Sequence, residues 1–173
     1  MIPILLKVLR TGIVTEPAPQ PRTDWRSRAS EIQGEILALL GRALVIREVD
    51  AGSCNACELE VHAVNNPYYN LEGMGIKFAA SPRHADMLLV IGPVSRNMEQ
   101  ALRIAYEAMP APKLVVAVGD CGRDGGIFGA CYATCGGVSK VLPVDVAIPG
   151  CPPAPIDILQ GILTAVLRKD GRR

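Results

Sequence analysis

The chain has 173 residues, which suits one domain of ordinary size and is enough to bury a hydrophobic core. Its 18 basic and 17 acidic side chains nearly cancel, which excludes the strongly basic surface of a nucleic-acid-binding protein and a polybasic membrane patch. The apolar fraction is 49% and the aromatic fraction only 4%, a balance typical of a parallel sheet that is covered on both faces.

The apolar stretches are too short to span a membrane, because none approaches the roughly 20 apolar residues that a bilayer requires. The stretch Ile2–Leu9 lacks a charged leader and a small-residue cleavage site, so we do not expect a signal peptide. In a chain without an export signal, six cysteines are expected to serve as metal ligands or redox thiols rather than to form disulfides. We therefore expect a cytoplasmic protein.

The amino-terminal residues differ in character from the rest of the chain. Residues 1–23 are expected to form an arm that contacts partner subunits, since Ile2–Leu9 can pack on a partner and three prolines between Glu16 and Arg22 forbid a helix. Asp24–Leu40 has an apolar stripe and predicts a helix. This helix opens a single domain that we expect to span residues 24–173.

Strands and helices alternate through this domain. Apolar segments predict five strands, at Ala43–Val49, Ile76–Ala79, Met87–Ile91, Leu114–Val118 and Val144–Ile148. Helices are predicted at Cys54–Val64, Asn97–Met109 and Ile156–Arg168, and a glycine-rich loop is predicted at Gly122–Gly137. The alternation predicts an α/β fold of three layers, built on a flavodoxin-like, doubly wound parallel sheet of about five strands.

Three of the predicted strands run directly into cysteines. Cys54 and Cys57 follow the first strand, Cys121 follows the fourth and Cys151 follows the fifth. The carboxyl ends of parallel strands meet at one edge of the sheet, which is where α/β proteins bind their ligands. Cys54 and Cys57 also lie one helical turn apart, so their sulfurs can converge. We therefore expect the four thiols to meet above this edge.

Four thiolates can bind either Zn²⁺ or an iron–sulfur cluster, and the surrounding residues favour the cluster. Structural zinc sites usually use two close cysteine pairs, whereas only one pair is close here. Glycines near Cys121 and Cys151 let the backbone approach a bulky inorganic core, and Cys151-Pro152 resembles the Cys-Pro end of bacterial ferredoxin motifs. A zinc site and a thiol–disulfide pair at Cys54 and Cys57 stay open as alternatives.

Glu58 lies four residues after Cys54, so we expect both side chains on one helix face. There Glu58 can transfer protons or bind an arginine of a partner; the alternative is a solvated acid in the first helical turn, where the dipole favours it. Cys131 and Cys135 are expected to be small apolar residues that fill the glycine-rich loop. A ligand exchange or a second redox pair is the alternative for these two cysteines.

Several motifs, taken in order, resemble one known family. They are Gly52-Ser53-Cys54-Asn55-Ala56-Cys57-Glu58, Ser81-Pro82-Arg83-His84-Ala85-Asp86, Gly92-Pro93-Val94, Gly119-Asp120-Cys121 with Gly125-Gly126, and Ile148-Pro149-Gly150-Cys151-Pro152-Pro153. Over about Ala43–Leu167 the chain resembles the family of the 20 kDa subunit of complex I and the small subunits of nickel–iron hydrogenases. The segment Leu9–Pro17 is similar to the small subunit of membrane-bound, energy-converting (group 4) hydrogenases and formate hydrogenlyases.

This resemblance implies an electron-transfer subunit with one cubane 4Fe-4S cluster on Cys54, Cys57, Cys121 and Cys151, and without a complete active site of its own. It implies three kinds of partner at the inner face of the cell membrane: a large subunit with a nickel–iron site, a ferredoxin-type iron–sulfur subunit and the membrane subunits of the complex. Complex I proper has two adjacent cysteines at the first site, whereas two residues separate Cys54 from Cys57 here, as in hydrogenases. The spacing favours a hydrogenase over a complex I-like NADH:quinone oxidoreductase, which stays open as the alternative.

Overall fold

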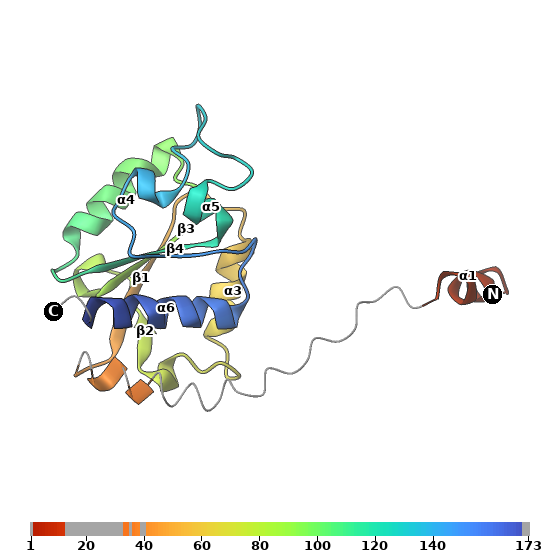
Figure 1. The fold of residues 1–173 in the computed structure, drawn as a ribbon, viewed down its shortest axis with the longest axis horizontal. Helices are drawn as coiled ribbons and strands as arrows, with labels where there is room; N and C mark the ends of the chain where they lie inside the picture. Colours follow the sequence, from red (N-terminus) through yellow and green to blue (C-terminus); the bar gives the residue numbers. More distant parts are fainter. Residues whose placement is uncertain (1, 13–32, 35, 39–40, 171–173) are drawn as a thin grey trace.

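The computed structural model describes residues 2–12, 33–34, 36–38 and 41–170 (Figure 1). Within the predicted arm, Ile2–Thr11 forms helix α1, on which Leu6 and Leu9 are exposed. The helix predicted over Asp24–Leu40 lies outside the described residues, apart from positions 33–34 and 36–38, which are helical. The three prolines between Glu16 and Arg22 also lie outside the described residues.

One parallel sheet of five strands forms the centre of the domain (Figure 1). Its strands are β1 (Leu44–Asp50), β2 (Ile76–Phe78), β3 (Met87–Ile91), β4 (Leu114–Val118) and β5 (Val146–Ile148). Their order across the sheet is β2-β1-β3-β4-β5, and every neighbouring pair is parallel. This is the flavodoxin-like strand order, so the predicted fold class is confirmed.

Helices follow four of these strands, β1, β3, β4 and β5, along the chain. They are α3 (Ala56–Val64), α4 (Arg96–Ala108), α5 (Gly119–Asp124) and α6 (Pro155–Asp170), with 3-10 turns η1 (Glu72–Met74), η2 (Pro82–His84) and η3 (Val138–Lys140). The loop predicted to start at Gly122 starts later, because α5 continues until Gly125 ends it with a left-handed φ of 99°. No helix among the described residues is long and apolar enough to cross a membrane.

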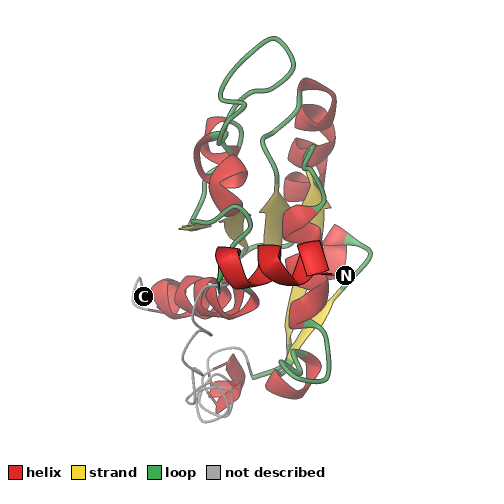
Figure 2. Cartoon of the chain, turned by 90° about the vertical axis from the view of Figure 1, so that its right-hand side faces the viewer, coloured by secondary structure: helices red, strands yellow, loops and turns green. Residues whose placement is uncertain are grey.

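Helices lie on both sides of the sheet (Figure 2). Two hydrophobic cores, one on each face of the sheet, hold the three layers together. All five residues of β3 are buried, and they alternate between the cores: Met87, Leu89 and Ile91 belong to one, Leu88 and Val90 to the other. Helices α3 and α6 close the first core, and α4 and η3 close the second. Burial on both faces explains why this strand is apolar throughout.

Candidate functional site

The carboxyl edge of the sheet collects the four predicted thiols. Cys54 and Cys57 follow β1, Cys121 lies in α5 directly after β4, and Cys151 follows β5. Cys57 is buried, with 9% of its surface exposed. The other three line one cavity of about 400 Å³, whose lining is Cys54, Asp120, Cys121, Arg123, Asp124, Gly126, Ile127, Phe128 and Cys151. The strand ends therefore bring together the cysteines that are far apart in the sequence.

The four sulfurs lie close enough to affect one another's charge. The pKa of the Cys57 thiol is raised to about 12, first by burial and then by the negative charges of Glu58, Cys121, Cys54 and Cys151. The pKa of Cys121 is raised by burial and then by Cys151 and Cys54. Among the described residues, no three His, Cys, Asp or Glu side chains form a group that holds a single metal ion. Four thiolates that repel one another in this way are unfavourable unless positive charge compensates them. An iron–sulfur core would supply that positive charge.

Two glycines run directly against the sulfurs. A Cβ atom at Gly119 would lie 2.8 Å from Cys57 Sγ, and one at Gly126 would lie 2.9 Å from Cys121 Sγ. Both glycines have positive φ, +78° and +53°, which L side chains rarely adopt. Because they have no Cβ, the backbone can pack directly against the sulfurs, as it does around a bulky iron–sulfur core, so the residues present fit such a core.

The loop that carries Cys54 is held by contacts that the sequence analysis missed. The Asp50 carboxylate accepts hydrogen bonds from the backbone N–H groups of Gly52 and Ser53, both at 2.8 Å. Asn55 then takes a left-handed conformation with φ of 73°, so the chain turns before α3 begins. Cys54 therefore lies outside the helix: the predicted helix is present and ends at Val64 as expected, but it starts two residues later than predicted. An Asp two residues before a Gly was the signal for this turn.

The same turn corrects the prediction for Glu58. Because Cys54 precedes the helix, the two residues do not share a helix face, and Glu58 instead accepts a hydrogen bond from the Ser53 hydroxyl. The second carboxylate oxygen, Oε2, is buried, and no hydrogen-bond partner for it lies in the described part of the chain. Such an unpaired buried acceptor is costly, so Glu58 is not the fully solvated acid of the alternative reading.

The part of the chain that carries these cysteines matches a known protein family. The family is described as NADH ubiquinone oxidoreductase, 20 Kd subunit, and its sequence model matches residues 54–165. The stretch starts at Cys54 and includes the other three cysteines at the carboxyl edge of the sheet. The chain belongs to this family. The resemblance inferred from the motifs is thereby confirmed.

Relatives of this family member come from hydrogenases and from a quinone oxidoreductase. Formate hydrogenlyase subunit 7 of Escherichia coli is 43% identical over 148 residues, which are 86% of this chain and 58% of the relative. The probable membrane-bound hydrogenase subunit mbhJ of Pyrococcus furiosus is 39% identical over 82% of this chain and 84% of the relative. An NADH-quinone oxidoreductase subunit of Desulfovibrio desulfuricans is 40% identical over 84% of this chain and 80% of the relative. The chain spans little more than half the length of the first relative.

A solved structure agrees with this membership. It is a chain of the membrane-bound sulfane sulfur reductase, an archaeal respiratory membrane complex, with a TM-score of 0.67. The two chains are 31% identical, and the match covers 82% of this chain and 77% of the other.

The two remaining cysteines of the chain, Cys131 and Cys135, do not line the cavity of Cys54, Cys121 and Cys151. Cys131 is exposed, which corrects the expectation that it fills the loop, and hydrogen bonding to the Thr134 hydroxyl lowers the pKa of its thiol. Cys135 is half-buried against the second core, as expected for a small apolar residue, and its thiol donates to Glu99 Oε2 at 3.2 Å. The structure thus separates their environments: one thiol faces solvent and the other helps to pack α4.

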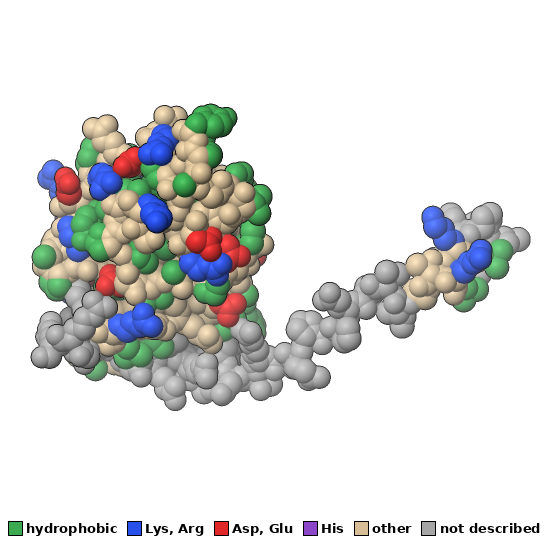
Figure 3. Space-filling view, turned by 45° about the horizontal axis from the view of Figure 1, so that its top comes forward, with side chains coloured by type: hydrophobic (Ala, Val, Ile, Leu, Met, Phe, Trp, Pro, Cys, Tyr) green, Lys and Arg blue, Asp and Glu red, His purple; other side chains and the backbone are tan. Residues whose placement is uncertain are grey.

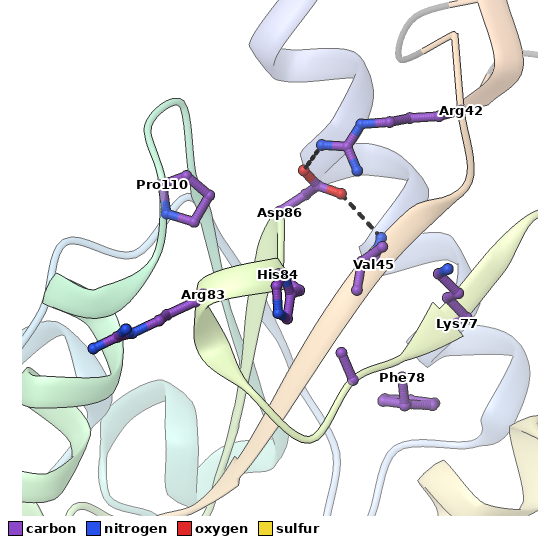
Figure 4. Close-up of a pocket in the computed structure, with 9 residues that line it drawn as sticks. Arg42, Val45, Lys77, Phe78, Arg83, His84, Asp86 and Pro110 are labelled. Atoms are coloured by element: carbon purple, nitrogen blue, oxygen red, sulfur yellow. Dashed lines mark hydrogen bonds and ion pairs between the residues drawn. The ribbon is translucent and has the colours of Figure 1, made fainter.

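A second cavity, of about 550 Å³, opens at the amino edge of the sheet (Figure 4). There the Asp86 carboxylate accepts hydrogen bonds from the Arg42 guanidinium and from the Val45 N–H, which joins the starts of β1 and β3. Arg83 and His84, from η2, are exposed in its lining. The family motif that contains these residues therefore lies at the edge of the sheet away from the cysteines, and Asp86 has a structural role.

Proposed function

We propose that the chain is the electron-transfer subunit of a membrane-bound hydrogenase and carries one 4Fe-4S cluster on Cys54, Cys57, Cys121 and Cys151. In this proposal electrons pass one at a time between a ferredoxin-type subunit and the nickel–iron site of a large subunit. The observation that carries the proposal is the convergence of four thiols from three strand ends, with glycine backbone against two of the sulfurs. The hydrogenase relatives from Escherichia coli and Pyrococcus furiosus support this choice of complex.

The residues of the chain prepare the site for such a cluster. Thiols bind iron as thiolates, so each must release its proton, and positively charged iron would offset both the burial and the repulsion by neighbouring negative charges that raise the pKa of Cys57. The buried position of Cys57 shields one side of the site from water, which is one of the factors that set a cluster's potential. A bound cluster supplies one-electron transfer, while the chain holds it and presents it at the surface.

The loop beside the cavity is the proposed contact with the large subunit. Loop 125–137 follows α5 and carries Ile127 and Tyr132, which are 92% and 96% exposed, together with the exposed Phe128. The loop rises from the top of the domain in Figure 1, and Figure 3, which turns that side forward, shows hydrophobic side chains at the upper margin. Exposed large apolar side chains next to a functional cavity are typical of a protein interface. Docking here brings the partner directly to the cysteines.

The proposal also covers the amino-terminal residues and the position of the complex at the membrane. The exposed Leu6 and Leu9 of α1 support a role for residues 1–23 in contacts with other subunits, while residues 24–173 form the cluster domain. The relatives from membrane-bound complexes support a peripheral position on the inner face of the cell membrane, next to membrane subunits.

Glu58 is the proposed proton-transfer group near the cluster. Its Oε1 accepts a hydrogen bond from the Ser53 hydroxyl. Its buried Oε2 has no hydrogen-bond partner among the described residues, so it can accept a proton. Glu58→Gln keeps the size of the side chain and an oxygen for Ser53, but it cannot release a proton. Hydrogen oxidation by the variant complex should fall while its iron content stays unchanged. An unchanged rate would exclude this role.

The second candidate is the cluster subunit of a complex I-like NADH:quinone oxidoreductase, which the 40% identity to the Desulfovibrio desulfuricans NADH-quinone oxidoreductase relative favours. The two-residue gap between Cys54 and Cys57 favours the hydrogenase. Purifying the complex through a tag on this chain separates the two candidates. A hydrogenase should contain nickel and oxidise hydrogen with a viologen dye. A complex without nickel that reduces quinone with NADH would support the second candidate instead.

The cluster itself is tested on the full chain, purified without oxygen. The wild type should be brown and contain about four irons and four sulfides per chain, and Cys54→Ser and Cys151→Ser should each abolish the cluster. A colourless, zinc-loaded protein would support the zinc alternative. Disulfide exchange that depends on Cys54 and is indifferent to Cys151→Ser would support the thiol-redox alternative.

A further inference from the structure

We infer that Asp120 is a positioning residue that fixes Cys121 and Cys151 relative to each other through a two-bond bridge to Gly150. The bridge is a property of the folded chain, and its use for a cluster rests on the proposed function. The two thiols come from different strand ends, 30 residues apart in the sequence, so a contact between their loops must set their spacing.

Two reciprocal hydrogen bonds make the bridge. The Asp120 N–H donates to the Gly150 carbonyl oxygen at 2.8 Å, and the Gly150 N–H donates to Asp120 Oδ1 at 3.1 Å. Asp120 directly precedes Cys121, and Gly150 directly precedes Cys151. Each bond therefore holds the two residues that directly precede ligand cysteines.

The bridge continues the sheet beyond the point where its ladder ends. The pairing of β4 with β5 ends at Val118 and Ile148, and the bridge joins the residues two positions beyond the end of each strand. Cys121 and Cys151 thus occupy equivalent places, three residues beyond a paired strand position. Without a backbone acceptor from the ladder, the Gly150 N–H depends on the Asp120 side chain.

The surroundings make this spacing strict. Arg123, one helical turn further along α5, places Nη1 2.9 Å from Asp120 Oδ1 and so orients the carboxylate. A Cβ at Gly119 would lie 3.2 Å from the Gly150 carbonyl oxygen, and a Cβ at Gly150 would lie 2.6 Å from the Pro153 Cα. The backbones are packed too tightly for one loop to slide past the other. Cys54 and Cys57 need no such bridge, because only two residues of continuous chain separate them.

The test compares variants that separate the hydrogen bond from the charge. Asp120→Asn keeps an oxygen that can accept the Gly150 N–H but removes the charge, whereas Asp120→Ala removes both. Glu107→Gln is the control for the loss of a carboxylate charge, since Glu107 is exposed on α4 and does not line the cavity. Each full-length variant is purified without oxygen for iron analysis and electron paramagnetic resonance, and the iron-free chain is used for hydrogen–deuterium exchange at Gly150.

In Asp120→Ala, exchange at Gly150 should be about fivefold faster, because one net hydrogen bond is lost. Cluster retention should fall about 10- to 100-fold, as for other residues that orient metal ligands, and the resonance signal should broaden. Asp120→Asn and Glu107→Gln should behave as the wild type in exchange and retention. Wild-type behaviour of Asp120→Ala would overturn the inference, as would a defect in Asp120→Asn equal to that in Asp120→Ala, because the charge would then be responsible.

Two further results keep the conclusions separate. Where Asp120→Ala does not fold, Asp120→Glu replaces it: the charge stays but the carboxylate is displaced, and faster Gly150 exchange is expected. Wild-type exchange in Asp120→Glu would contradict the bridge. A wild-type chain that holds no iron, combined with faster exchange in Asp120→Ala, would refute the proposed function and support the bridge.

Discussion

Replacing Gly119 by alanine tests the close approach of backbone and sulfur at the centre of the site. The new Cβ would lie 2.8 Å from Cys57 Sγ and 3.2 Å from the Gly150 carbonyl oxygen, at a φ of +78°. The left-handed conformation costs an L residue about 1–2 kcal/mol. Overpacking a tight site costs roughly a further 1–3 kcal/mol. The free energy of unfolding of Gly119→Ala should therefore fall by about 2–5 kcal/mol, the sum of these two ranges.

Gly75→Ala is the matched control for this change. Gly75 has almost the same φ, +77°, but nothing lies within 4 Å of the position of its Cβ. Its alanine variant should lose only the conformational part, about 1–2 kcal/mol, and should keep the cluster. Urea unfolding of the iron-free chain, followed by circular dichroism, measures both variants, and iron analysis measures the cluster. Equal destabilisation of the two variants, with full iron in Gly119→Ala, would refute the argument that the sulfur needs this glycine.

Three further predictions concern other parts of the chain. In the iron-free protein, iodoacetamide should modify the exposed Cys131 first and the buried Cys57 last, since the pKa of Cys131 is lowered and that of Cys57 is raised to about 12. Between pH 7 and 9 the rate of modification of Cys57 should rise about tenfold per pH unit, because the thiolate fraction rises tenfold per pH unit below the pKa. Mass spectrometry that finds Cys57 modified as fast as Cys131 would contradict the predicted order. Asp86→Ala should lower the free energy of unfolding by about 1–3 kcal/mol, because Arg42 and a backbone N–H lose their acceptor. The iron content should not change, because Asp86 lies at the opposite edge of the sheet from the cysteines. Loss of iron from folded Asp86→Ala protein would contradict a purely structural role for Asp86. Tyr132→Ser should change stability by no more than about 0.5 kcal/mol, because the ring is exposed, yet it should weaken co-purification with the large subunit; undiminished co-purification would remove loop 125–137 from the proposed interface.

The sequence by itself determined the alternation of elements and which strands end in cysteine. Both depend on local properties: apolar runs of strand length, helical periodicity and the Gly and Pro residues between them. The buried β3 and β4 were placed residue for residue, because strands covered on both faces leave an uninterrupted apolar signal. Knowing that the strands are parallel was then enough to place Cys54, Cys57, Cys121 and Cys151 at one edge.

The tertiary structure alone decided what surrounds those thiols. The left-handed turn at Asn55 removes Cys54 from the helix, which helical periodicity does not reveal. The contact of Gly119 with Cys57 and the bridge from Asp120 to Gly150 join residues from separate strands. Such contacts depend on the order of strands across the sheet and on close packing between loops, and no local pattern records either of them. The sequence therefore indicated which thiols meet, and the packed fold decided how they are held.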